Sequence, residues 1–202
     1  MRSLRSLTLL LLIPACADVE NPDEHDHDHD HGLVTTIELV FTPDGGGEAL
    51  SFLWADPQDD GDPSIDTVVL SEGSYALDVR FTNELAEPPE DVTAEVAEEG
   101  EEHQVFVTGS GVQSEATGAN PAALLDLAYA DSDANGLPLG LTHDAVTVQT
   151  GTGEIVVTLR HLPEQDGSAI KTAGLAEAVA AGGFESIGGD TDVSVVFPLD
   201  VQ

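Results

Sequence analysis

From residue 33 onward the chain alternates apolar and polar residues with a period of two, and this pattern constrains its fold most strongly. In residues 75–82 apolar side chains occupy every second position, at Tyr75, Leu77, Val79 and Phe81. Successive side chains of a β-strand point to opposite faces, so this alternation predicts a strand with one buried face.

The same alternation, or a short apolar run between turn residues, predicts nine strands. They are residues 33–41, 50–54, 65–70, 75–82, 104–108, 124–129, 145–149, 154–160 and 192–201. Gly, Pro, Asn and Asp separate them, as in the turn at residues 43–47. Many short strands with few helices predict an all-β fold, an antiparallel immunoglobulin-like β-sandwich of about 8–9 strands. We expect residues 33–202 to form a single β-sandwich domain around one core.

Helical patterns are scarce in this part of the sequence. Residues 91–99 begin with acids and are followed by Gly100, which predicts one short acidic helix. Residues 175–181 predict a further helical turn within a glycine-rich loop.

The amino terminus has the pattern of an export signal. Arg2 and Arg5 precede an apolar run at residues 7–13, which is shorter than the roughly 20 residues that span a bilayer. Residues 13–16, Ile-Pro-Ala-Cys, resemble the lipobox of bacterial lipoproteins, although Pro14 stands where Ala or Ser is usual. We therefore predict a signal peptide at residues 1–15 and acylation of Cys16, which would anchor the protein in a membrane. The alternative is an ordinary secretory signal cut near Ala15 or Ala17.

Residues 16–32 read as a disordered tether that is rich in histidine and aspartate. Four histidines alternate there with three aspartates: His25, Asp26, His27, Asp28, His29, Asp30 and His31. Imidazole is a ligand for divalent transition metals, and flexible neighbours can close a shell around one ion. The pattern predicts metal binding, with zinc as the first candidate. The alternative is a solvated spacer.

Two further segments are candidate cation sites. Glu95, Glu99 and His103 are spaced so that an unbroken helix would place them on one face, as a second metal set, although Gly100 is expected to end the helix first. Asp131, Asp133 and Asn135 match the first half of a calcium loop, but the spacing fits a hairpin with an Asn-Gly turn at least as well. His143 and His161 are isolated in sequence and are predicted as loop or strand-end residues rather than ligands.

The charge of the chain excludes several classes of function. Asp and Glu number 39 against five Lys and Arg, and Arg2 and Arg5 belong to the signal. A nucleic-acid partner is excluded because no basic patch is present. The acids suit cations as partners, but adaptation to salty surroundings explains them equally well. A single cysteine excludes an internal disulfide framework, and no catalytic motif is found, so we do not predict an enzyme.

The order of these features resembles a family of small bacterial His/Asp-rich lipoproteins. The resemblance is carried by Cys16 with the His-rich tether, residues 34–39 (VTTIEL), 102–106 (EHQVF), 127–136 (LAYADSDANG) and 189–193 (GDTDV). Such proteins often carry the label of a type 1 periplasmic-binding fold, which requires two α/β lobes with long helices that this sequence does not predict. The resemblance implies an exported lipoprotein of the cell envelope that serves a metal-uptake receptor in the outer membrane. The rival hypothesis is an immunoglobulin-like surface adhesion or structural module.

Overall fold

The computed structural model describes residues 33–202, which form twelve strands, two α-helices and one 3-10 helix. In chain order these elements are β1 (Thr36–Pro43), β2 (Leu50–Ala55), β3 (Ser64–Ile65), β4 (Val68–Leu70), β5 (Ser74–Asn83), β6 (Glu90–Asp91), α1 (Val92–Glu98), β7 (His103–Thr108), β8 (Val112–Gln113), β9 (Leu125–Tyr129), β10 (Thr142–Thr147), β11 (Gly151–His161), α2 (Leu175–Gly182), η1 (Phe184–Ser186) and β12 (Asp190–Val201). The predictions for the signal peptide, Cys16 and the tether lie outside the described residues. In the described part no helix is long and apolar enough to cross a membrane.

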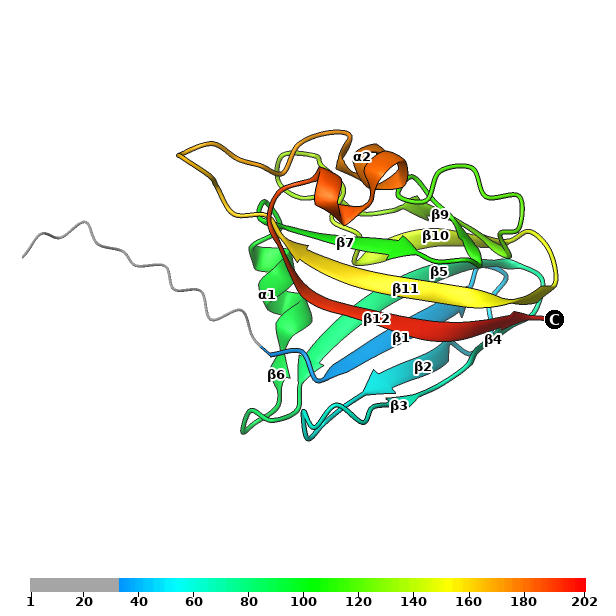
Figure 1. Ribbon diagram of the computed structural model, residues 1–202. Coiled ribbons are helices and arrows are strands. Elements are labelled where there is room, and N and C mark those ends of the chain that lie inside the picture. Colours follow the sequence, from blue (N-terminus) through cyan, green and yellow to red (C-terminus); the bar gives the residue numbers. More distant parts are fainter. Residues whose placement is uncertain (1–32) are drawn as a thin grey trace, which may run out of the picture. The chain divides into compact units, whose positions relative to one another are not determined.

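The strands form two sheets. One has the order β3-β2-β1-β5-β10-β9-β8, with β6 paired to β5, and the other has the order β4-β12-β11-β7. Figure 1 shows β11 and β12 running in front of β1 and β5, with α1 at the end of the sheets where β7 and β12 begin. The all-β class is therefore confirmed.

One hydrophobic core joins the inner faces of the two sheets. Its largest fully buried side chains include Phe41 and Phe81 from the first sheet and Phe197 from the second. Strand β5 shows how the sequence pattern produces this core, because Tyr75, Leu77, Val79 and Phe81 are buried in alternation with more exposed residues.

The pairing of the strands differs from the prediction in two places. We expected antiparallel strands throughout, but β12 pairs with β4 and β8 pairs with β9 in parallel. Residues 65–70, predicted as one strand, form two strands in different sheets. The Asp66 carboxylate accepts a hydrogen bond from the N–H of Leu53 on β2, and the Asp66 N–H donates to the Leu53 carbonyl. The chain then crosses to the other sheet, where Val68 pairs with Leu199.

Two short helices cover different parts of the sheets. Helix α1 begins after Asp91, whose carboxylate accepts a hydrogen bond from the Ala94 N–H, and it buries Val92 and Val96 in the main core. This matches the predicted acidic helix. Helix α2, in the segment expected to form a helical turn, packs Leu175 and Val179 over Phe106 of β7 in a second apolar cluster. The outer face of β7 is thereby covered.

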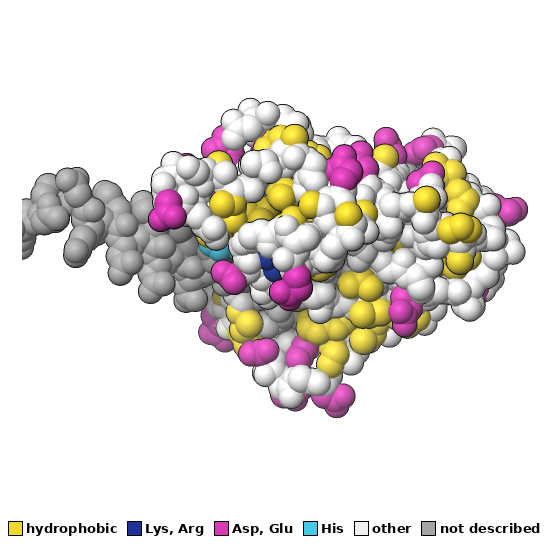
Figure 2. Space-filling model, turned by 45° about the horizontal axis from the view of Figure 1, so that its top comes forward, with side chains coloured by type: hydrophobic (Ala, Val, Ile, Leu, Met, Phe, Trp, Pro, Cys, Tyr) yellow, Lys and Arg dark blue, Asp and Glu magenta, His cyan; other side chains and the backbone are white. Residues whose placement is uncertain are grey.

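Acidic side chains are spread over the surface of the folded part. Figure 2 shows Asp and Glu dotted across the face in view, with apolar patches between them and very little basic surface.

Candidate functional site

Two histidines lie face to face at one end of the core. His103 begins β7 and His161 ends β11, and the two residues are direct partners in the antiparallel pairing of these strands. Their imidazole rings are stacked, with centroids 5.0 Å apart and planes 22° from parallel. His103 is 2 % exposed. One face of the buried His103 ring therefore packs against the ring of its cross-strand partner, His161.

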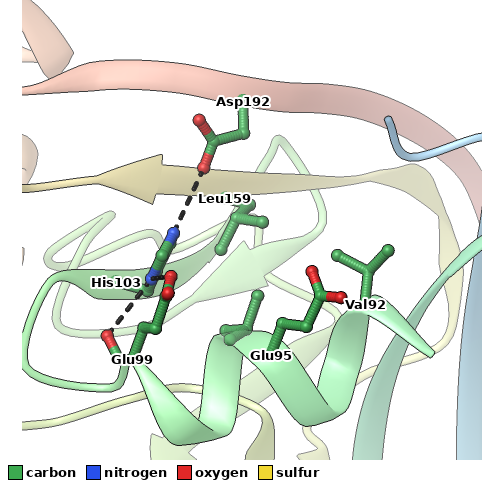
Figure 3. Close-up of a pocket in the computed structure, with 7 residues that line it drawn as sticks. Val92, Glu95, Glu99, His103, Leu159 and Asp192 are labelled. Carbon is green, nitrogen blue, oxygen red and sulfur yellow. Dashed lines mark hydrogen bonds and ion pairs between the residues drawn. The ribbon is translucent and has the colours of Figure 1, made fainter. Parts of the chain in front are cut away.

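Carboxylates surround this histidine pair. The Nε2 atom of His103 lies 3.8 Å from Oδ2 of Asp192, and its Nδ1 lies 3.9 Å from Oε2 of Glu99. The Nε2 atom of His161 lies 3.8 Å from Oε2 of Glu102. Figure 3 shows Glu99 and Asp192 on opposite sides of the His103 ring, one from the end of α1 and the other from β12.

A β-bulge places Asp192 in this cluster. Leu159 on β11 pairs with Val193 and Arg160 pairs with Thr191, so that no residue of β11 lies opposite Asp192. A bulge turns one side chain out of the regular alternation of its strand, and such irregularities re-aim side chains at binding sites in many proteins. The extra residue in β12 explains how its carboxylate reaches His103.

The end of α1 determines which of the predicted ligands meet. The helix ends at Glu98, and the Glu99 N–H donates to the Glu95 carbonyl as the last helical bond. A turn follows, in which the Glu102 N–H donates to the Glu99 carbonyl, and His103 enters β7. Glu99 and His103 therefore meet through a turn, in agreement with the expectation that Gly100 follows the helix end.

Glu95, the third member of that predicted set, lines the same pocket but lies farther along α1 beside Val92 (Figure 3). Burial, together with a hydrogen bond and repulsion from Glu90, raises the pKa of the Glu95 carboxyl above its ordinary value. The Glu95 carboxyl therefore interacts with Glu90.

The pocket beside His103 is small. It is lined by three apolar side chains of α1 and β11 together with Glu95, Glu99, His103 and Asp192. Its cavity volume of about 20 Å³ is enough for one water-sized sphere. The pocket therefore excludes an organic ligand but has room for one water molecule or ion. Within residues 33–202, no three or more His, Cys, Asp or Glu side chains form a group that could hold a metal ion.

The calcium candidate is a tightly bonded turn. Both oxygens of the Asp131 carboxylate accept backbone N–H groups, from Gly140 at 2.7 Å and from Thr142 at 3.0 Å. Oδ1 of Asp133 accepts the N–H groups of Asn135 and Leu137. Gly136 has a φ of +77°, as the hairpin interpretation requires. These contacts favour the hairpin over the calcium loop.

The remaining oxygen of Asp133 faces a cation of the protein itself. Nζ of Lys171 lies 2.8 Å from Oδ2 of Asp133 and donates to the Gly100 carbonyl at 2.7 Å. Burial alone would raise the pKa of the Asp133 carboxyl, but Lys171 and the backbone N–H groups hold it below its ordinary value. Burial lowers the pKa of the Lys171 ammonium. This ion pair is buried and fixes the hairpin to the turn after α1.

His143 lies in β10, apart from the candidate site. Its ring is 2 % exposed and lies 4.9 Å from the ring of Tyr129, centroid to centroid. Burial lowers the pKa of His143 to about 4, against an opposing effect of the Asp144 carboxylate. This imidazole is therefore neutral at pH 7. His161 ends β11 and His143 is the second residue of β10, so both lie near strand ends, as predicted.

Three members of the cluster, Asp192, His161 and Glu102, were not predicted from the sequence. Asp192 comes from a bulge for which no local signal exists, and His161 meets His103 only because β7 and β11 are neighbours. One usable signal was available: His103 directly precedes the predicted strand 104–108 and His161 directly follows the predicted strand 154–160, which allows cross-strand pairing.

Comparison with known proteins does not assign this chain to a family. No family model matches the chain, and neither the curated proteins nor the solved structures contain a significant match.

Proposed function

We propose that this protein is an exported, lipid-anchored metal-binding protein that captures a divalent transition metal, with zinc as the first candidate. The observation that carries the proposal is the alternation of His25, His27, His29 and His31 with three aspartates. Neutral imidazoles are zinc ligands, and the interleaved carboxylates raise the local concentration of cations. Acylation at Cys16 would hold this segment at a membrane of the cell envelope, where the captured ion could pass to an uptake receptor.

Zinc titration of the protein with and without residues 17–32 tests this function. We expect the complete protein to bind zinc through the tether, and deletion of the tether to remove those equivalents. A matched variant replaces the four tether histidines with asparagine and keeps the aspartates. The tether then keeps the charge that it has when its histidines are neutral. Unchanged stoichiometry and affinity after either change would refute the tether as ligand source and favour the spacer of a surface module.

The pH dependence of the titration identifies the ligand type. Imidazole must be neutral to bind a metal, so zinc affinity at the tether should fall as the pH is lowered through about 6.5. Binding that is unchanged at pH 5 would assign the metal to carboxylates.

A further inference from the structure

We propose that Lys171 and Asp133 form an intramolecular isopeptide bond, in which Nζ of the lysine is joined to Cγ of the aspartate as an amide. The two residues lie in separate connections, Asp133 in the hairpin between β9 and β10 and Lys171 in the long connection from β11 to α2 (Figure 1). The bond joins these two connections covalently. It involves only the folded part of the chain, so it goes beyond the proposed metal binding and does not depend on it.

The amine and the carboxyl group are in contact and shielded from solvent. Nζ of Lys171 lies 2.8 Å from Oδ2 of Asp133, and each side chain is 1 % exposed. Because Oδ2 is bonded directly to Cγ, Nζ lies within about 4 Å of the carboxyl carbon. Reacting atoms in a productive arrangement are about 3–3.5 Å apart, so a small rotation of the lysine side chain suffices for attack. The Gly100 carbonyl accepts a hydrogen bond from Nζ at 2.7 Å and holds the amine in place.

The two oxygens of the Asp133 carboxyl group are in different environments, as an acyl transfer requires. Oδ1 accepts the N–H groups of Asn135 and Leu137, both at 2.9 Å. Fixed backbone donors of this kind stabilise the negative charge that develops on a carbonyl oxygen when a nucleophile adds. Oδ2 has no hydrogen-bond partner within residues 33–202, although Nζ lies beside it. Oδ2 is therefore the oxygen that leaves.

The reaction needs no reagent beyond the two side chains. A proton first passes from the Lys171 ammonium to Oδ2, which gives a neutral amine and a carboxylic acid. Burial favours this step because it removes both charges, and burial lowers the pKa of the Lys171 ammonium. The lone pair of Nζ then forms a bond to Cγ. A second proton moves from Nζ to Oδ2, and the Cγ–Oδ2 bond breaks with release of one water molecule.

The amide suits this buried site better than the ion pair does. Two buried charges carry a desolvation cost that their mutual attraction offsets only in part. The amide is neutral, and its oxygen Oδ1 keeps the two backbone N–H donors. The ion pair is the resting form before reaction, because Lys171 and the backbone N–H groups keep the pKa of the Asp133 carboxyl low. We therefore expect the bond to form slowly after the chain has folded.

The cross-link takes the place that a disulfide has in other exported proteins. The chain has a single cysteine and cannot form an internal disulfide. A covalent link between residues 133 and 171 restricts the unfolded chain, and this restriction stabilises the folded state. The long connection from β11 to α2 is then held to the hairpin by a bond that does not depend on redox conditions.

Mass spectrometry of the denatured full chain tests the bond. After prolonged incubation of the folded protein, we expect the mass of the major species to be one water molecule below the calculated value. The matched control is Lys171→Arg, which keeps the positive charge but offers no neutral amine, because a guanidinium is not deprotonated in proteins. This variant should have its full calculated mass.

Digestion with trypsin locates the lost water. Trypsin cleaves after Lys and Arg, which after residue 16 are Arg80, Arg160 and Lys171. In the cross-linked chain residues 81–160 stay joined to residues 161–202, and no cleavage follows Lys171 because its amine is blocked. These results come from the parent chain alone, so they decide the question even if the variant does not fold.

A parent chain that keeps its full calculated mass, or that is cleaved after Lys171 into separate peptides, would overturn the proposal. A loss of water that persists in the Lys171→Arg variant would also overturn it. Such a loss would come from another side chain, for instance an aspartate that has cyclised before a glycine.

Discussion

At the scale of single residues, His143 shows what the fold does to a titratable side chain. Its imidazole is buried between β5 and β9, where it pairs with Leu77 and Tyr129. Its Nδ1 has no hydrogen-bond partner within the described residues. The protonated ring would be an unpaired buried charge, and burial therefore lowers its pKa to about 4.

The protein should lose stability through His143 as the pH falls from 6.5 to about 4. In this window the unfolded chain binds a proton that the folded state rejects, so acid favours unfolding. The loss reaches about 3 kcal/mol once the pH lies below both pKa values. His143→Phe should remove it, and urea unfolding of both proteins at pH 7 and pH 4 measures the difference.

Other side chains also titrate between pH 7 and pH 4. The test therefore compares the loss of unfolding free energy over this range in the parent protein with the loss in the His143→Phe variant. A variant that loses as much stability between pH 7 and pH 4 as the parent protein would show that His143 is not the group responsible.

At the scale of elements, α1 connects a local sequence signal to the candidate site. Asp91 caps its N-terminus, and Glu99, the residue that follows its last turn, presents its backbone carbonyl to His103. Loss of the cap leaves an amide without its acceptor, and Asp91→Ala should cost about 1 kcal/mol in unfolding free energy.

Urea denaturation checks this prediction, with Glu98→Ala as the control. Glu98 is exposed in the last turn of α1, and its replacement should change stability by less than about 0.5 kcal/mol. A cap variant that is as stable as the control would contradict the assigned role of Asp91.

Elements with local signals were predictable, and those that depend on distant partners were not. The alternation in residues 75–82 and the acids before Gly100 gave β5 and α1 closely. Strands β6 and β8 have two residues each and exist only through pairing with β5 and β9. The parallel partner of Val68 lies more than a hundred residues away at Leu199.

The candidate site shows the same division. Glu99 and His103 are four residues apart in one segment, so their proximity was predictable, although they meet through the turn after α1 and not on a helix face. Asp192 reaches them through a β-bulge in β12, and the position of such an extra residue depends on the register with β11. Sequence spacing therefore found the half of the site that one segment supplies.

At the scale of the whole molecule, the acidic surface is almost unopposed. Lys171 and Arg160 are buried, so that of the three cations after residue 16 only Arg80 lies exposed, beside Glu38 at 3.2 Å. A dense population of like charges on a compact surface opposes folding through mutual repulsion. Salt at about 0.1 M screens exposed charges beyond about 10 Å.

We therefore expect the melting temperature at pH 7 to rise when NaCl is increased from 10 mM to 0.5 M, by about 2–4 °C for each kcal/mol of repulsion that is screened. The rise should level off as screening saturates. Near pH 4.1, the isoelectric point of the sequence, the same salt series should have little effect because the net charge is small. Calorimetry at both pH values separates charge screening from a general salt effect, and a melting temperature that falls with salt at pH 7 would show that the exposed acids stabilise the fold through local partners.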